Sequence, residues 1–227
     1  IKYTNKQDVD HLIASVRAKY PFKVDWEAKQ YIGMHLKWDY DERTVRVSMD
    51  GYVDQALKEF KHEIPKQRHY GPSKMDRPDY GQKIQYTKVD NSAPLTPAKI
   101  KFLQQVTGKF LFYARAVDNT MMHALNDIAA STDVESTYNA TVYFLNYAAC
   151  NPDAEIIYRA SDMILQVDSD AAYLVSPKAR SRAGGYHFLG NKNKTQFNGP
   201  VLILAKIIKN VMASAAEAEV AALYLNA

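Results

Sequence analysis

Two carboxylates in the last third of the chain have a residue type and a setting that suit metal-dependent chemistry. Asp170 follows a short apolar run that begins at Met163, a pattern typical of a strand that delivers a carboxylate to the edge of a sheet. Glu219 lies in a predicted helix whose N-terminus is a capping box of Ser214 and Glu217. The capping box explains those two residues but gives no local structural role to Glu219. Carboxylates of this kind clamp hard divalent cations. The pattern suggests a divalent-metal nuclease site with carboxylate ligands.

The elements that must position these carboxylates are strands followed by a helix. Strands are predicted at residues 155–158, 163–168, 184–189 and 200–208, and the helix follows Ser214. Strand alternation places Asp168 on the same face as Asp170, so Asp168 is an alternative ligand. Gly184 and Gly185 inside a strand indicate a bulge or a close backbone approach rather than a phosphate loop, because no helix follows directly.

The first sixty residues predict a helix, a β-hairpin and a second helix. Thr4 is a candidate helix cap, residues 31–38 and 44–49 form the two strands of the hairpin, and Asp50 is a candidate cap for the second helix. Tyr31, Gly33 and Trp38 are candidate nucleic-acid contacts: a glycine permits close approach of a backbone, and aromatic rings pack on sugars or bases. The alternative is ordinary packing in the core or across strands.

The middle of the chain predicts a connector and then a helical region. Residues 63–95 hold several prolines and many polar residues, which is typical of a long linker, whether solvated or in contact with a nucleic-acid backbone. Three helices are predicted after it, at residues 96–116, 121–130 and 132–150. The first begins at Thr96 as cap with Pro97 in the first turn, and Thr132 is the candidate cap of the third.

Composition narrows the function classes. The 227 residues carry a formal net charge of +4 and one cysteine, Cys150, which excludes an internal disulfide and any multi-cysteine zinc site. No apolar run approaches the ~20 residues of a membrane-spanning helix. Basic residues are locally dense, and Arg180 and Arg182 are candidate contacts for a nucleic-acid backbone. The alternative for these arginines is ordinary solvated surface.

Several motifs, in order, resemble one family. The Ser-Asp-Ala of residues 169–171, residues 179–190 and the Ser-Ala-Ala-Glu-Ala-Glu of residues 214–219 resemble the start of the ribonuclease H domain of copia-type retrotransposon polyproteins. Upstream, residues 108–113 and 124–126 resemble blocks of the thumb and connection region of its reverse transcriptase. The family commonly has Arg-Pro-Asp where this chain has Val117, Asp118 and Asn119, so no role of that arginine carries over.

The resemblance implies a fold and a division into regions. It implies an α+β chain with four regions. Residues 1–62 would hold the end of the polymerase palm, a primer-grip-like hairpin and a first thumb helix, and residues 63–95 a linker. Residues 96–152 would form a helical thumb and connection, and residues 153–227 the first half of a ribonuclease H-like mixed sheet, with three strands and a helix. We expect the chain to be a piece of a longer polyprotein, because the family's Tyr-x-Asp-Asp motif and two further carboxylates are missing.

The resemblance also implies a function, with Asp170 and Glu219 as catalytic and metal-binding residues and Mg²⁺ or Mn²⁺ as the cofactor of the complete domain. The parent would copy RNA into DNA and hydrolyse the RNA strand, whereas this chain alone is expected to be inactive. Its implied partners are an RNA/DNA hybrid or template-primer and the rest of the polyprotein. No membrane is among the implied partners. The implied location is the cytoplasm, within virus-like particles, or the nucleus, and not outside the cell. Two alternatives are a non-catalytic nucleic-acid-binding remnant or host-recruited protein, and an unrelated metal-dependent phosphoesterase that is active by itself.

Overall fold

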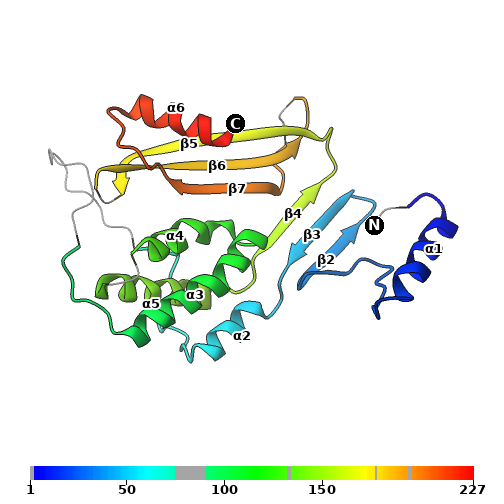
Figure 1. The fold of residues 1–227 in the computed structure, drawn as a ribbon, viewed down its shortest axis with the longest axis horizontal. Helices are drawn as coiled ribbons and strands as arrows, with labels where there is room; N and C mark the ends of the chain where they lie inside the picture. Colours follow the sequence, from blue (N-terminus) through cyan, green and yellow to red (C-terminus); the bar gives the residue numbers. More distant parts are fainter. Residues whose placement is uncertain (1–2, 75–89, 132–133, 177, 194–195) are drawn as a thin grey trace.

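The chain folds into a mixed α+β arrangement of two antiparallel sheets and several helices (Figure 1). The structure is a computed structural model that describes residues 3–74, 90–131, 134–176, 178–193 and 196–227. In these ranges there are six α-helices and one short 3₁₀ helix. None of the helices in the described ranges has the length and apolar character needed to cross a membrane. The α+β class expected from the sequence is confirmed at this level.

The first sheet joins the N-terminal hairpin to a strand from the second half of the chain. Its strand order is β1-β2-β3-β4, and all neighbours are antiparallel. Its bounds are β1 Gln30–Tyr31, β2 Met34–Asp39, β3 Thr44–Ser48 and β4 Glu155–Arg159. The sequence-based prediction assigned the strand at residues 155–158 to the C-terminal, ribonuclease H-like sheet. The structure corrects this assignment, because β4 pairs with β3 from Thr44 opposite Arg159 to Ser48 opposite Glu155.

The second sheet is a three-stranded antiparallel meander with helices on both faces. Its order is β5-β6-β7, so β5 and β7 are its edge strands. The bounds are β5 Ile164–Ser176, β6 Arg180–Gly190, β7 Pro200–Ile207 and α6 Ala215–Asn226. Helix α6 lies on one face and the helical group containing α4 lies on the other (Figure 1). Three strands and a helix in this order agree with the predicted elements.

The main core is in the helical group. Its helices are α2 Tyr52–Glu59, α3 Pro97–Ala116, α4 Met122–Ala130 and α5 Glu135–Cys150, with the 3₁₀ helix at Asn119–Met121. Phe110, Tyr113 and Phe144 are completely buried among them, and the Phe110 and Phe144 rings meet edge to face at 5.2 Å. Large buried aromatic rings of this kind dominate the energetics of a small core.

The observed N-terminal caps of the helices agree only in part with the predicted cap residues. Thr96 caps α3 with Pro97 in the first turn, as predicted, because its side chain accepts from the Lys99 amide. Helix α1, Lys6–Arg17, is capped by Asn5 rather than Thr4. Helix α2 begins after Gly51 in a left-handed conformation rather than at a cap made by the Asp50 side chain. The predicted cap Thr132 lies outside the described residues.

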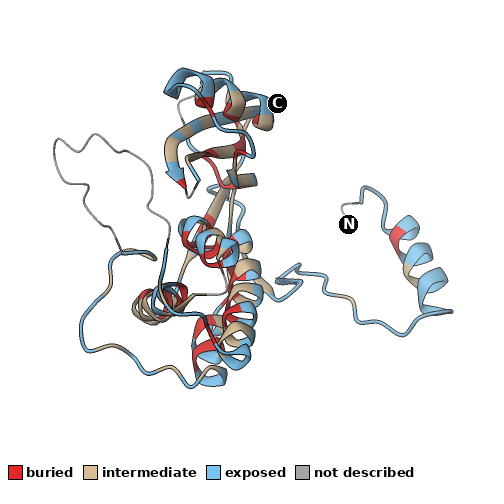
Figure 2. Ribbon diagram, turned by 60° about the vertical axis from the view of Figure 1, so that its left-hand side comes forward, coloured by how far each residue is buried: buried red, intermediate tan, exposed pale blue. Residues whose placement is uncertain are grey.

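Helix α1 stands apart from the rest of the chain in both overall views (Figure 2). Only Val9 of the helix is buried. Leu12 is 41% exposed and Val16 is 39% exposed. Their neighbours are Phe22 and Trp26 of the following segment, so α1 packs locally rather than on the main core.

Candidate functional site

The two predicted metal ligands are positioned by β5 and α6. Ser169 of β5 accepts a hydrogen bond from the Asn226 amide of α6 at 3.0 Å, and Ala171 packs against the apolar residues under α6. Both therefore face α6. Because side chains alternate along a strand, Asp170 lies on the opposite face, away from the helix that carries Glu219. The structure does not bring the two carboxylates together on one face.

A cation site does not fit this arrangement. Among the described residues there is no group of three or more histidine, cysteine, aspartate or glutamate side chains that could hold a metal ion. Asp168, the alternative ligand, shares the face of Asp170 and lies near Tyr186, whose pKa is raised mainly by burial and in part by the Asp168 charge. Hydrolysis with two cations needs carboxylates that converge on both ions. The described residues do not supply that convergence.

The polar groups that do converge beneath α6 involve a residue that the sequence analysis missed. The Asn226 side chain faces His187 Nε2 at 3.0 Å and donates to the Gly184 carbonyl at 2.9 Å. A Cβ at Gly185 would lie 1.8 Å from Asn226 Oδ1. The strand glycines therefore mark a close approach, one of the two predicted alternatives, and the register is regular through them. A glycine pair in a strand was the signal available in the sequence.

Arg182 is a structural residue in this fold. Its side chain is buried at 5% exposure and its Nη2 pairs with the Asp127 carboxylate of α4. This burial contradicts the prediction that Arg182 is an exposed contact for a nucleic-acid backbone. The physical reason is that β6 is the central strand of its sheet and α4 covers that face. Arg180, at the start of β6, is half-buried.

The three predicted hairpin contacts lie at the surface of the first sheet. Tyr31 is 59% exposed and Trp38 is 43% exposed. Gly33 has a φ of +78°, and Ile32 before it has a φ of 48°, so the two residues form the tight turn between β1 and β2. A Cβ at Gly33 would meet no atom within 4 Å. The glycine is explained by its backbone conformation, and the turn leaves open space beside it.

An open cleft runs between β2 and the segment that precedes β1. Its volume is about 800 Å³, and its lining includes the aromatic residues Trp26, Trp38 and Tyr40, the lysines Lys29 and Lys37, and the acidic residue Glu27. The Trp38 and Tyr40 rings are stacked with centroids 6.2 Å apart and planes 11° apart. Trp38 Nε1 donates to the Ala28 carbonyl at 2.9 Å, which holds the indole in place. The cleft therefore presents fixed aromatic surface beside two lysines, of which Lys29 pairs with Glu27 of the same lining.

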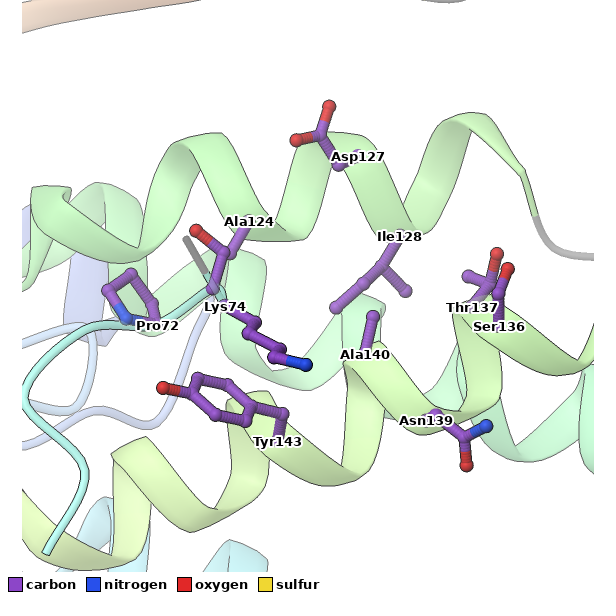
Figure 3. Close-up of a pocket in the computed structure, with 11 residues that line it drawn as sticks. Pro72, Lys74, Ala124, Asp127, Ile128, Ser136, Thr137, Asn139, Ala140 and Tyr143 are labelled. Atoms are coloured by element: carbon purple, nitrogen blue, oxygen red, sulfur yellow. The ribbon is translucent and has the colours of Figure 1, made fainter. Parts of the chain in front are cut away.

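A second groove, between α4 and α5, is closed at one end by residues 72–74. It has a volume of about 700 Å³ and mostly apolar walls. Figure 3 shows the Lys74 ammonium group reaching into it between Tyr143 and Ile128, while the Asp127 carboxylate points out of it. A lysine among apolar walls can be a nucleophile, but catalysis also needs a neighbouring group that moves the proton, and the Asp127 carboxylate points away. The groove does not form a catalytic constellation.

A polar cavity of about 610 Å³ lies where α3 and α5 end near β4. Asp118 in its wall is buried, and this burial raises the pKa of its carboxyl group. The Asp118 carboxylate accepts from the Thr120 amide at 3.2 Å and from the Thr120 hydroxyl. Burial also raises the pKa of Tyr113, nearby, to about 12, and the Tyr113 hydroxyl donates to the Pro152 carbonyl at 2.9 Å. Both groups are held by structural hydrogen bonds.

Comparison with known proteins adds no relative: no family model, no curated protein sequence and no solved structure matches this chain.

Proposed function

We propose that this chain is a nucleic-acid-binding part of a copia-type reverse transcriptase and ribonuclease H, and that it holds an RNA/DNA hybrid or template-primer. The parent polyprotein would copy RNA into DNA and hydrolyse the RNA strand. The proposal is supported by the order of the motifs, from the hairpin through the helical region to the Ser-Asp-Ala and Glu-Ala-Glu segments. A three-stranded meander followed by a helix at the C-terminal end is compatible with it.

The single observation that carries the binding function is the surface beside the hairpin. Trp38 and Tyr40 are exposed there, and Lys29 and Lys37 line the same cleft. Lysine and arginine contacts to phosphates supply most of the affinity of non-specific nucleic-acid binding. Exposed aromatic rings beside them are the usual companions of such contacts.

A second candidate function is a non-catalytic binding protein, and a specific observation favours it. Asp170 lies on the face of the β5–β7 sheet away from α6, so the chain does not present the carboxylate pair that hydrolysis would need. A remnant or a host-recruited protein would still hold nucleic acid through the cleft. Both candidates bind nucleic acid through the cleft. They differ in whether the chain belongs to a polyprotein that copies RNA and hydrolyses the RNA strand.

The test is the salt dependence of binding to a labelled RNA/DNA hybrid, measured by fluorescence anisotropy. We expect log K to fall linearly with log salt with a slope of about −3 to −4, which corresponds to about four phosphate contacts. Lys37→Gln should make the slope shallower by about 1. Lys101→Gln, an exposed lysine on α3, is the matched control and should leave the slope unchanged. Binding that does not respond to salt would contradict the proposal.

A further inference from the structure

The cleft beside β2 has a geometry that selects among nucleic-acid forms. We infer that it binds unpaired nucleobases of a single strand by stacking on the Trp38 and Tyr40 rings, with the adjoining phosphates held by Lys29 and Lys37. The inference rests on the proposed function, and it names the form of nucleic acid that this part of the surface takes. It is carried by the rings, the lysines and the acidic turn that surround the cleft.

The rings form a prepared stacking surface. Their planes differ by only 11°, and the hydrogen bond from Trp38 Nε1 to the Ala28 carbonyl fixes the indole before any ligand arrives. Tyr40 is 80% exposed, so most of its ring is available to a further flat group. Stacking on aromatic side chains requires a base whose faces are free, which is the situation in a single strand and not inside a duplex.

The segment before β1 adds a third ring and an ion pair to the lining of the cleft. Trp26 is 54% exposed, and the Lys6 ammonium lies 5.9 Å from the centre of its ring. Lys29 pairs with Glu27, and Lys37 lines the cleft from β2. A volume of about 800 Å³ lies within the range of small-ligand sites.

The charges around the cleft also favour one path for the nucleic-acid backbone. Tyr40 lies in the turn between β2 and β3, where Asp39, Asp41 and Glu42 surround it in sequence. These carboxylates repel phosphates, which favours a backbone path away from the turn, beside Lys37 and the Lys29–Glu27 pair, with the bases towards Tyr40. A duplex can still contact the lysines through its phosphates, but its bases are stacked on each other and cannot stack on the rings. Asp41→Asn should therefore strengthen binding of a single strand about twofold.

The experiment uses intrinsic fluorescence of the whole chain, because both of its tryptophans line this cleft. Titration with a short oligothymidylate should quench the tryptophan emission. An abasic strand with the same number of phosphates should quench it much less and bind about tenfold more weakly, and an RNA/DNA hybrid should bind with little quenching. Equal binding and equal quenching by the abasic strand would overturn the inference.

Variants separate stacking from general disruption. Tyr40→Leu should weaken binding of oligothymidylate about tenfold, whereas Tyr40→Phe keeps the ring and should bind like the wild type. Tyr20→Leu removes a tyrosine that is 66% exposed outside this cleft and should change nothing. If Tyr40→Leu binds normally while the hybrid still shows its steep salt dependence, the stacking site is wrong and the proposed function stands. If neither the single strand nor the hybrid binds, both fail.

Discussion

The Arg182 guanidinium of β6 and the Asp127 carboxylate of α4 form an ion pair across the interface between the helical group and the second sheet. The arginine is 5% exposed, and within the described part of the chain its Nε and Nη1 have no hydrogen-bond partner. The other Asp127 oxygen lies 3.2 Å from His123 Nδ1. Beside it, the Asn126 amide donates to the Ala205 carbonyl of β7 at 2.8 Å. Two successive residues of α4 thus hold two strands of the sheet.

Asp127→Ala should lower the free energy of unfolding by about 2–3 kcal/mol, because it leaves the buried Arg182 charge without its counter-ion. The half-exposed position of Asp127 keeps this value below that of a fully buried pair. The measurement is a urea unfolding curve. Asp41→Asn, an exposed aspartate in the β2–β3 turn, is the control and should change the midpoint little.

The double variant Asp127→Leu/Arg182→Met tests the cause of that loss. With both charges replaced by apolar groups, no buried charge is left unpaired, so the double variant should be more stable than Asp127→Ala. If the double variant were less stable than the single one, packing of the arginine stem rather than charge would hold the interface.

Gly185→Ala should destabilise the fold by about 1–3 kcal/mol, because a methyl group there overlaps the Asn226 side chain and forces α6 away from the sheet. Gly108→Ala is the matched control and should change the stability in the opposite direction. It is an exposed glycine within α3, and a Cβ there meets no atom within 4 Å, so the fold should gain about 0.5–1 kcal/mol. Equal effects of the two substitutions in thermal or urea unfolding would contradict the close approach at Gly185.

Asp118→Asn should raise stability at neutral pH. Burial raises the pKa of the Asp118 carboxyl group above its ordinary value of 3.8, so the folded chain holds this proton more tightly than the unfolded chain. Wild-type stability therefore falls as pH rises from 3.8 through the folded-state pKa, and the cost is fully present above it. Asparagine does not titrate and still accepts from Thr120.

The difference between Asp118→Asn and the wild type should shrink as pH falls through the same window. Urea midpoints at neutral pH and near pH 3.8 measure it. An advantage of the variant that is the same at both pH values would show that the cause is packing rather than the buried charge.

The chain by itself should be catalytically silent with Mg²⁺ or Mn²⁺. A labelled RNA/DNA hybrid should be neither cleaved nor extended, because Asp170 and the helix carrying Glu219 lie on opposite faces of the sheet and the described residues include no group of converging metal ligands. The assay is gel electrophoresis of the labelled strands after incubation. Cleavage that disappears in Asp170→Asn would overturn this prediction and would mean that Asp168 or Glu217 completes a reduced site.

The sequence predicted the parts of this fold that depend on neighbours along the chain. The start of α3 at Thr96 and Pro97 is local, because a cap and a proline act within one helical turn. The predicted Ser214 cap also forms, with the Ser214 hydroxyl accepting from the Glu217 amide at 3.1 Å, while the Glu217 carboxylate accepts from the Ala213 amide rather than from that of Ser214. Strand alternation correctly placed Asp168 and Asp170 on one face of β5, because side chains alternate in any strand.

Tertiary structure decided the features that depend on residues far apart in the sequence. β4 joins β3, more than a hundred residues earlier, because the strand pairing depends on which edge is free and which apolar face must be covered. Arg182 is buried because α4 lies over the central strand, which no pattern near Arg182 reveals. Alternation predicts that two residues share a face, but it does not say which face a helix covers. That choice separated Asp170 from α6, and it follows from packing of the whole chain around its cores.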